Sequence, residues 1–411
     1  MPVSDDPPCS ADAVVIGAGS LGASVAFHLV DLGVERVVLV ERSDAVSQTT
    51  RRAAGLSCEL QPTAFLTRMA SSSVRLIETF ERDTGETFPW HQPGSLKLAT
   101  SDEMAQRLAS DVERGRRTGI GIELVTAAEA AKLTPFVEPA PIRAASYTPT
   151  DVYFEPDELP RAYLRAAQRR GLDLRANTAV TAIGRQGDRV ASVVTSAGTI
   201  GTPVVVDTAG AWSALLGELA GVSVAIVPVR HHLRITEPIE AARPDLPIVR
   251  LMNYNVYARP CRGGLMLGAY EPAPMLLGAG ALTRDFDIDA LEMDGGVLDT
   301  LARDVAHIMP VLASAPIAEL RGGLPTMTAD GNPLLGPLPG LRGFFVLTGC
   351  CVGGLSKSPA YGRALATWIV DGKPDEDLSE AAPDRFEGRF DSAQALVDAC
   401  AWQYAHHYHK A

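Results

Sequence analysis

The chain has 411 residues, of which 46% are hydrophobic and 21% charged, and its formal net charge at pH 7 is −12. This length and composition predict a globular protein of about two or three domains. The acidic balance excludes a protein that binds nucleic acid, whose phosphates would be repelled, and no apolar run reaches the roughly 20 residues that span a bilayer.

Two further features bear on where the protein works. The N-terminal stretch MPVSDDPPCS lacks the basic patch and the apolar core of a signal peptide. The six cysteines are scattered and form no disulfide framework. The adjacent Cys350 and Cys351 are expected to be two thiols, since a disulfide between neighbours is strained. We therefore expect a cytoplasmic protein without a membrane partner.

The first predicted elements, in residues 11–42, are a strand, a glycine turn, a helix and a second strand. Gly17, Gly19 and Gly22 form a GxGxxG motif, in which the glycines permit the tight turn, backbone approach to a pyrophosphate and close helix–strand packing. The helix N-terminus then offers N–H groups to the phosphate. Glu41, after the second strand, can accept hydrogen bonds from ribose hydroxyls. It disfavours NADP, but it does not distinguish NAD from FAD.

The segment that follows, SQTTRRAAGLSCE, predicts a loop that wraps the pyrophosphate; the alternative is a basic surface loop. Helical spacing recurs in residues 62–84 and 157–170, and PVVVDTAGAWSALLGELAG again predicts strand, turn and helix. Residues 222–320 are rich in strands. Near the end, Gly353 and Gly354 open a helix whose N-terminus can direct N–H dipoles at the negative charge of a reduced flavin, unless the turn is only structural.

These strand–turn–helix units lie near the start, the middle and the end of the chain, with strand-rich segments between them. This order predicts one nucleotide-binding domain assembled from separated segments, with a second domain inserted between them. The predicted fold class is therefore α/β.

The motifs also resemble a known family. From about residue 11 to 375 the chain is similar to the D-amino-acid-oxidase superfamily of FAD-dependent oxidoreductases, and most similar to the branch of dimethylglycine and sarcosine dehydrogenases and glycine oxidase. The segments that carry the resemblance, in order after GxGxxG, are TTRRAAGL, VVDTAGAW, PVRHHLRITEP, YARPCRGGLMLGAYE, TADGNPLLGP and GGLSKSPAYGRALATWI. The resemblance implies that the dinucleotide is FAD.

It also implies a Rossmann-like FAD-binding domain built from discontinuous segments and an α+β substrate domain with a mainly antiparallel sheet. The expected boundaries are 11–85, 140–220 and 321–375 for the FAD-binding domain, 86–139 and 221–320 for the substrate domain, and 376–411 for a C-terminal segment. The expected FAD contacts are Gly17, Gly19, Gly22, Glu41, Arg42, Thr49, Arg51, Arg52, Ala53, Gly55, Leu56, Val180, Ala209, Gly210, Trp212, Gly323, Gly353, Gly354, Leu355, Ser356 and Lys357.

The sequence departs from the family's pattern at two positions. Dimethylglycine-dehydrogenase-like members have a histidine just before AAG that bonds covalently to the flavin, whereas this chain has Arg52. We therefore expect non-covalent FAD, with Arg52 against the flavin. Sarcosine-oxidase-like members carry a substrate-binding lysine where this chain has Ser356, with Lys357 one position later. This shift changes the direction of the side chain, so the carboxylate anchor of those members is not expected to be retained here.

Candidates for substrate contact lie in the strand-rich region. Arg259 can bind a carboxylate bidentately, or it can form a surface or interdomain salt bridge. Tyr254 and Tyr257 can form walls of the site or pack in the core. His231 and His232 are neighbours on a strand, so their side chains point to opposite faces. We assign the functional role to His232, and the alternative is that this histidine is structural.

Cys351 and the C-terminal histidines each have a functional and a structural interpretation. Cys351 is a candidate for contact with the flavin ring or a small core residue. His406, His407 and His409 resemble a metal-binding tract, but no cysteine or carboxylate accompanies them, so we expect a surface tail and no metal.

The resemblance implies oxidation of a C–N bond in an amino acid or a secondary or tertiary amine, such as an N-methyl or cyclic imino acid. Hydride passes to the flavin, and the imine that forms is hydrolysed by water. The expected partners are the amine substrate and either oxygen or an electron carrier. The alternatives are an FAD-dependent 2-hydroxy-acid dehydrogenase and a flavin-binding subunit of a larger amine dehydrogenase complex.

Overall fold

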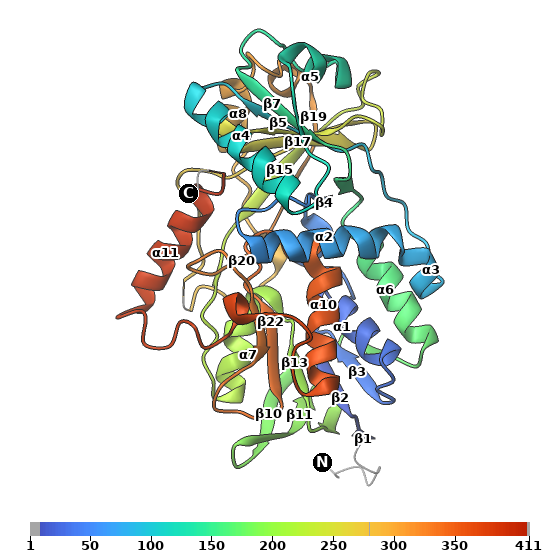
Figure 1. The fold of residues 1–411 in the computed structure, drawn as a ribbon. Coiled ribbons are helices and arrows are strands. Elements are labelled where there is room, and N and C mark those ends of the chain that lie inside the picture. Colours follow the sequence, from blue (N-terminus) through green and yellow to red (C-terminus); the bar gives the residue numbers. More distant parts are fainter. Residues whose placement is uncertain (1–8, 279, 409–411) are drawn as a thin grey trace.

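The computed structural model describes residues 9–278 and 280–408, which form two lobes, each built around its own large sheet (Figure 1). The lower lobe in Figure 1 contains a six-stranded sheet of order β21-β22-β13-β2-β3-β9, in which all neighbours are parallel except β21 and β22. Its strands are β2 (Ala13–Ile16), β3 (Val37–Val40), β9 (Asp173–Arg175), β13 (Val205–Asp207), β21 (Leu334–Pro337) and β22 (Phe344–Thr348).

The central strands of this sheet are continuous apolar runs because both faces of the sheet are covered. Val15 and Leu39 pack into a core with the helices on one face, and Val14 and Val38 pack into a second core on the other. The helices of the first face are α1 (Ser20–Asp31), α2 (Ala64–Glu78), α3 (Phe80–Thr84), α6 (Glu158–Arg169) and α10 (Gly354–Asp371). The second face meets α7 (Ser213–Ala220) and the four-stranded sheet β1 (Cys9–Ser10), β12 (Gly198–Gly201), β11 (Arg189–Thr195) and β10 (Val180–Gln186).

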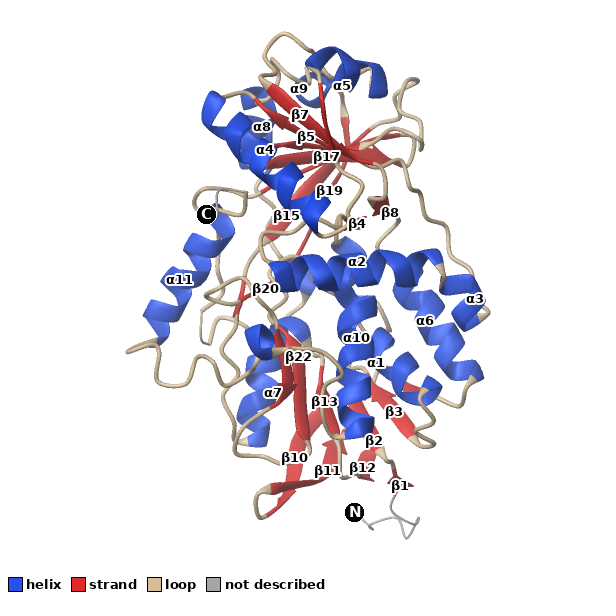
Figure 2. Ribbon diagram, in the orientation of Figure 1, coloured by secondary structure: helices blue, strands red, loops and turns tan. Residues whose placement is uncertain are grey.

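The upper lobe is an eight-stranded sheet whose neighbours are antiparallel except for the parallel pair β16 and β5 (Figure 2). Its strands, in spatial order, are β19 (Ile317–Gly323), β15 (His231–Thr236), β18 (Gly264–Ala269), β17 (Val256–Cys261), β16 (Ile248–Leu251), β5 (Ser95–Ala99), β7 (Ala144–Thr148) and β6 (Glu123–Val125). The helices of this lobe are α4 (Asp102–Arg117), α5 (Ala127–Leu133), α8 (Gly295–Asp304) and α9 (Val311–Ser314).

Short elements connect the two lobes. The two-stranded pairs are β4 (Leu56–Ser57) with β8 (Val152–Tyr153), and β14 (Val227–Pro228) with β20 (Thr326–Met327). The last helix, α11 (Ala393–Ala405), runs along the side of the molecule, and its C-terminal end lies beside the upper lobe (Figure 1). None of the helices in the described ranges is both long and apolar enough to cross a membrane.

The predicted fold class is confirmed: a parallel sheet assembled from separated segments is combined with a mainly antiparallel one. Two predicted boundaries differ from the sheets. Strand β7, assigned to the 140–220 part of the FAD-binding domain, pairs with β5 and β6 in the upper sheet. Strand β19 crosses the predicted boundary at residue 321. Both segments sit where the chain passes between the lobes, and local sequence patterns do not indicate which sheet a crossing strand joins.

Candidate active site

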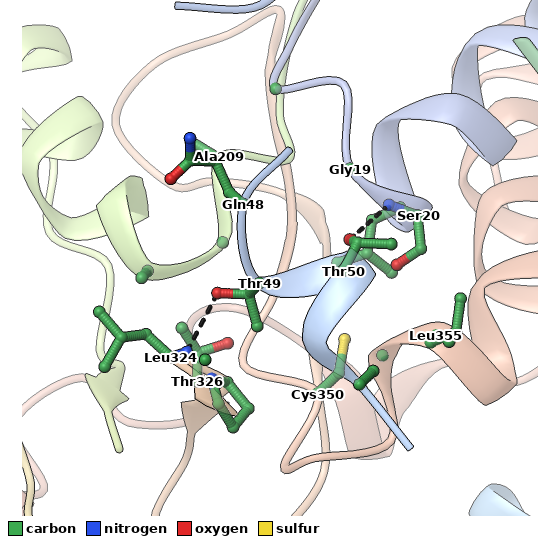
Figure 3. Close-up of a pocket in the computed structure, with 18 of the residues that line it drawn as sticks. Gly19, Ser20, Gln48, Thr49, Thr50, Ala209, Leu324, Thr326, Cys350 and Leu355 are labelled. Carbon is green, nitrogen blue, oxygen red and sulfur yellow. Dashed lines mark hydrogen bonds between the residues drawn. The ribbon is translucent and has the colours of Figure 1, made fainter. Parts of the chain in front are cut away.

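A cavity of about 970 Å³ runs between the two lobes. Its wall is formed by the glycine turn after β2, the end of β3, the 3-10 helix η1 (Thr49–Arg52), the turn after β13 and the start of α10 (Figure 3). On the side of the upper sheet, residues of β15, β16 and β17 complete it, together with the C-terminal residues His407 and Tyr408.

The glycine turn has the geometry of a pyrophosphate cradle. Gly17 adopts a φ of +103°, and a Cβ there would lie 2.7 Å from the carbonyl oxygen of Thr208. At Gly22 a Cβ would lie 1.9 Å from the carbonyl oxygen of Gly17, so α1 can pack this closely only without a side chain. Gly19 is the N-cap of α1 and supplies no side-chain cap. The first turn of α1 is therefore suited to an anion.

Glu41 stands at the end of β3 and lines the cavity. Its Oε2 accepts a hydrogen bond from the amide of Ala18 at 2.9 Å, and its Oε1 accepts one from the amide of Ser43 at 3.0 Å. Burial raises the pKa of its carboxyl group, and these hydrogen bonds oppose that rise. Each carboxylate oxygen can accept more than one hydrogen bond, so both can also receive ribose hydroxyls.

The middle of the cavity is formed by η1 and the start of α10. Thr49 Oγ1 accepts a hydrogen bond from the amide of Leu324 at 3.1 Å, and Thr50 Oγ1 accepts one from the amide of Ser20 at 3.0 Å (Figure 3). Helix α10 begins at Gly354 with Gly353 as an N-cap that has no side-chain cap, so its N-terminus is open to the cavity. A phosphate cradle, a ribose acceptor and an uncapped helix N-terminus along one cavity fit FAD.

Most of the residues predicted to contact FAD line this cavity. They are Gly17, Gly19, Glu41, Arg42, Thr49, Arg52, Ala53, Gly55, Leu56, Val180, Ala209, Gly210, Trp212, Gly323, Gly353, Gly354, Leu355, Ser356 and Lys357. Gly22 lies outside the wall, because it packs against Gly17. Arg51 is exposed and lines a separate pocket of about 310 Å³ instead.

Two cavity arginines are held by other residues of the chain. The guanidinium of Arg42 lies 3.8 Å from the centre of the Trp212 ring. Arg52 forms an ion pair with Asp289 and donates hydrogen bonds to the carbonyl oxygens of Ser47, at 2.5 Å, and Gln48, at 2.8 Å. Arg52 therefore lines the cavity and also fixes the loop that contains it.

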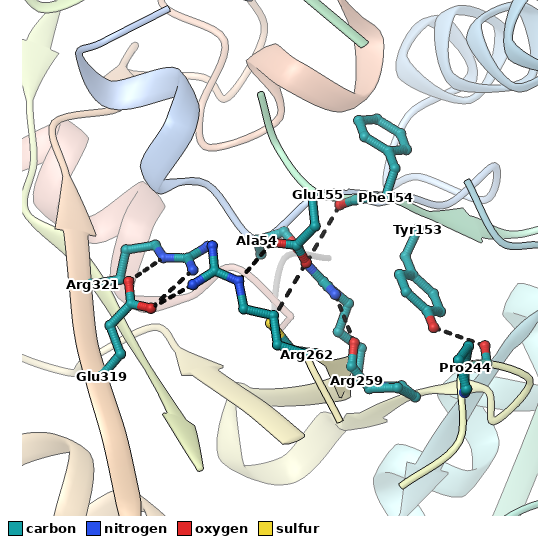
Figure 4. Close-up of polar contacts among 11 residues, drawn as sticks. Ala54, Tyr153, Phe154, Glu155, Pro244, Arg259, Arg262, Glu319 and Arg321 are labelled. Carbon is teal, nitrogen blue, oxygen red and sulfur yellow. Dashed lines mark hydrogen bonds and ion pairs between the residues drawn. The ribbon is translucent and has the colours of Figure 1, made fainter. Parts of the chain in front are cut away.

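Arg259 does not fit the carboxylate-binding role predicted for it. It is 1% exposed and is not among the residues that line the cavity. Figure 4 shows its polar contacts. Its Nε donates to the carbonyl oxygen of Ala54 at 2.7 Å, its Nη1 to that of Pro260 at 2.6 Å, and its Nη2 lies 3.1 Å from Glu155. The alternative, a salt bridge between segments, is the arrangement in the structure.

The histidine at the cavity is His231 and not His232. Both lie on β15 with opposite directions, as expected for neighbours on a strand. His232 turns away from the cavity, and its Nδ1 accepts a hydrogen bond from the amide of Asp294 at 3.3 Å. His231 lines the cavity, with Nε2 2.8 Å from the Tyr257 hydroxyl and Nδ1 2.7 Å from the Tyr404 hydroxyl.

His231 and Tyr257 carry no charge at neutral pH. Burial lowers the pKa of His231 to about 3, so the imidazole is neutral. Burial also raises the pKa of Tyr257 well above its ordinary value, so its hydroxyl keeps its proton. Tyr257, a predicted wall residue, does line the cavity, as does the predicted Cys351. Cys350 and Cys351 are free thiols.

A cavity residue that the sequence analysis did not select is Arg250. It is the Cα partner of Tyr257 across β16 and β17, so the two side chains share one face of the sheet. Its Nη2 lies 3.0 Å from Cys58 Sγ, and no carboxylate of the described residues lies within 4.0 Å of its guanidinium. The signal was present in IVRL, where one arginine interrupts a buried apolar strand.

Lys357 is a second cation at the wall. It is 5% exposed, and its Nζ lies 3.5 Å from Gln61 Oε1. The neighbouring Ser356 turns back to its own helix and donates to the carbonyl oxygen of Gly353 at 3.0 Å. Burial lowers the pKa of Lys357 to about 8. Lys357 is therefore mainly cationic at neutral pH and loses its charge in the mildly alkaline range.

This titration predicts a pH effect on the binding of carboxylates. Because Lys357 is protonated below a pKa of about 8, the cavity loses one positive charge as the pH rises through that value. The Kd of a bound carboxylate should then rise between pH 7 and 9. In the Lys357→Met variant the Kd should be higher at pH 7 and nearly independent of pH over the same range. Titration with the carboxylate trimethylglycine, followed by the flavin difference spectrum, measures the Kd of each protein at each pH. The same dependence of Kd on pH in the two proteins would contradict the prediction.

His407 and Tyr408 are part of the site and not of a surface tail. His407 stacks on Tyr270 with ring centroids 3.9 Å apart, and the Arg250 guanidinium lies over the Tyr408 ring at 5.8 Å from its centre. The tail prediction is therefore wrong for His407, whereas His406 is exposed and His409 lies outside the described residues. The spacing of Cys400, Tyr404 and Tyr408, four residues apart, is the helical signal that could have indicated a buried face.

The fold and the site define an FAD-dependent oxidoreductase. The family model described as FAD dependent oxidoreductase matches residues 12–368, and the chain belongs to this family. The chain is 32% identical to mouse mitochondrial sarcosine dehydrogenase over 96% of its own length, and 30% identical to mouse mitochondrial dimethylglycine dehydrogenase over 93%. The structure is similar to L-proline dehydrogenase from P. horikoshii, with a TM-score of 0.84, 26% identity and coverage of 93% of this chain and 99% of the other.

The chain spans less than half the length of these two curated relatives, 43% of the sarcosine dehydrogenase and 45% of the dimethylglycine dehydrogenase. Their activities therefore belong to larger chains.

Proposed function

We propose that this protein oxidises a C–N bond of a small amino acid whose nitrogen is secondary or tertiary, such as an N-methyl or cyclic imino acid. One observation supports this most strongly. Arg250, a cation without a carboxylate partner among the described residues, faces the same cavity as the neutral His231–Tyr257 pair, and that cavity continues into the FAD site.

Arg250 and Lys357 act on both the carboxylate and the amine of such a substrate. A guanidinium binds a carboxylate bidentately, and burial strengthens the interaction because water screens it less. The same charges on Arg250 and Lys357 disfavour a protonated amine nearby, so they lower the pKa of a bound ammonium group. The aromatic faces of Tyr257, Tyr270 and Tyr408 offer apolar surface to N-alkyl groups. The amine is thus held neutral, with its lone pair available.

FAD would be held by Glu41 at its ribose, by the turn from Gly17 to Ser20 at its pyrophosphate, and by η1 and the start of α10 at its ring system. The chemistry that bound FAD supplies is acceptance of a hydride from the C–H bond beside the amine nitrogen. The chain's own residues fix the carboxylate, keep the amine unprotonated and limit access of water. The imine product is hydrolysed in water. Neither His231 nor Tyr257 needs to become charged.

We further propose that FAD is bound non-covalently, because Arg52 occupies the position of the flavin-linked histidine in the dimethylglycine-dehydrogenase branch and a guanidinium forms no such bond. Acid precipitation of the purified yellow protein should leave the flavin in the supernatant. Colour that stays in the pellet would overturn this proposal and would indicate attachment through another side chain, with the cavity thiols Cys350 and Cys351 as candidates.

The substrate class is tested by anaerobic bleaching of the flavin absorbance. The panel contains N-methyl amino acids, cyclic imino acids, 2-hydroxy acids and N,N-dimethylethylamine, which lacks a carboxylate. Bleaching by amino acids alone supports the proposal, whereas bleaching by 2-hydroxy acids alone replaces it with the alcohol-oxidising alternative. If no compound bleaches the flavin, the proposed activity is wrong for this chain alone. Readmission of air to a bleached sample then shows whether oxygen serves as acceptor. The five cysteines other than Cys9 are free thiols, which fits a reducing compartment such as the cytoplasm.

A further inference from the structure

The hydroxyl of Tyr404, on α11, has one hydrogen-bond acceptor among the described residues. Tyr404 is 0% exposed, and its oxygen lies 2.7 Å from Nδ1 of His231. Within the described part of the chain this is the only hydrogen-bond partner of that hydroxyl. A buried hydroxyl without an acceptor for its proton is costly, so Tyr404 donates and Nδ1 accepts.

The direction of this first hydrogen bond fixes the next two. A neutral imidazole carries one N–H, and with Nδ1 as an acceptor the proton resides on Nε2. Nε2 lies 2.8 Å from the hydroxyl oxygen of Tyr257, so His231 donates to Tyr257. The hydroxyl proton of Tyr257 therefore takes no part in the hydrogen bond with His231. Tyr257 lines the cavity, and its O–H is free to donate into it.

We propose that Tyr404 is a positioning residue that acts through His231 to orient the Tyr257 hydroxyl as a donor to the substrate's carboxylate, beside Arg250. The placement supports this role, because Arg250 and Tyr257 are Cα partners on neighbouring strands and share one face of the sheet. Reversal of the chain of hydrogen bonds would present a lone pair to the cavity and repel a carboxylate. The carboxylate part of this inference rests on the proposed function, whereas the direction of the hydrogen bonds does not.

The element that supplies Tyr404 lies beyond residues 12–368, which the family model matches. It is fixed in place by Asn255, whose Nδ2 donates to the carbonyl oxygen of Ala405 at 2.9 Å and whose Oδ1 accepts from the amide of Tyr408 at 3.2 Å. Cys400 is fully buried on the same helix. The C-terminal segment from 393 to 408 thus supplies a side chain that acts on the substrate end of the cavity.

The tautomer of His231 is the first measurement. Nitrogen NMR of the flavin-loaded protein labelled with ¹⁵N-histidine, with the His231 signals assigned by their loss in His231→Asn, should show a protonated Nε2 and a hydrogen-bonded, unprotonated Nδ1. A protonated Nδ1 in the wild-type protein would overturn the inference outright, whether or not any variant folds. In Tyr404→Phe, which removes only the hydroxyl, the Nδ1 signal should shift and the two tautomers should become mixed.

The second measurement is the affinity for a carboxylate. Trimethylglycine carries a carboxylate and a nitrogen without a lone pair, so it can bind without being oxidised. Tyr404→Phe should raise the Kd of trimethylglycine about tenfold, since a hydrogen bond to a charged group contributes about this much. Tyr163→Phe, which changes a buried tyrosine of α6 away from the cavity, is the control and should leave this Kd unchanged.

The outcomes separate the two proposals. Unchanged histidine signals and an unchanged Kd for trimethylglycine in Tyr404→Phe would refute the positioning role. If the wild-type protein shows no difference spectrum with trimethylglycine and no bleaching with any amino acid, the proposed function fails, and the donor role toward a carboxylate fails with it. The histidine spectra would still decide the direction of the hydrogen bonds.

Discussion

Replacement of Arg250 by glutamine should lower kcat/KM for a carboxylate-bearing amine about 30-fold to 4000-fold, with most of the loss in KM. Removal of one member of a buried, hydrogen-bonded charge pair costs about 2–5 kcal/mol, and about 1.4 kcal/mol corresponds to a tenfold change in rate. Arg250 can form such a pair with a bound carboxylate, because it faces the cavity and no carboxylate of the described residues lies within 4.0 Å of its guanidinium. Stopped-flow bleaching of the flavin under anaerobic conditions measures the loss.

Three comparisons make this prediction specific. Arg250→Lys should recover only part of the activity, since an ammonium keeps the charge and loses the two-pronged geometry. Arg243→Gln removes an arginine that is 60% exposed and lies on the segment leading to β16, and it should leave kcat/KM unchanged. For an amine that lacks a carboxylate, Arg250→Gln should have a much smaller effect, because only the influence of Arg250 on the pKa of the bound amine is then lost. An equal loss for substrates with and without the carboxylate would show that Arg250 supports the fold and does not bind the substrate.

The cofactor half of the site could be predicted from the sequence because it depends on local geometry. The turn through Gly17 and Gly22 is built by neighbouring residues, and Glu41, the acidic residue expected to bind ribose, directly follows the next strand. Such features reappear at fixed spacing wherever the turn is formed. The helix N-terminus at Gly353 is local in the same sense. These residues line one cavity in the structure, apart from Gly22, whose role is packing.

The substrate half could be predicted only in part, because it depends on which segments pair across the fold. Arg259 lies two residues beyond Tyr257 on β17 and shares its face, yet the cavity ends between them and Arg259 meets the backbone of Ala54 instead. Arg250 reaches the site because β16 pairs with β17 in one particular register. Tyr404 lies 173 positions along the chain from His231. No spacing within a single segment encodes these contacts.

Replacement of Glu41 by glutamine should have the largest effect on FAD binding, with an expected loss of affinity of about 30-fold to 1000-fold. Both carboxylate oxygens already accept amide hydrogen bonds, Oε2 from Ala18 and Oε1 from Ser43. An amide side chain must place its NH₂ group against one of these N–H donors and leave that buried donor unpaired, which costs about 1–3 kcal/mol, and it also loses a charged acceptor for the ribose, worth about 1.5–3 kcal/mol. Because the two losses overlap in one side chain, their sum is an upper bound.

The measurement is the Kd of FAD for the apoprotein, followed by quenching of flavin fluorescence, and it requires no substrate. Glu35→Gln is the matched control, since Glu35 is an exposed glutamate just before the same strand β3 and should bind FAD as the wild-type protein does. Thermal unfolding of the two apoproteins separates a local effect from a loss of fold. A wild-type affinity in Glu41→Gln would mean that the ribose is held by other groups, and that the carboxylate serves only to fix the turn at Ala18 and Ser43.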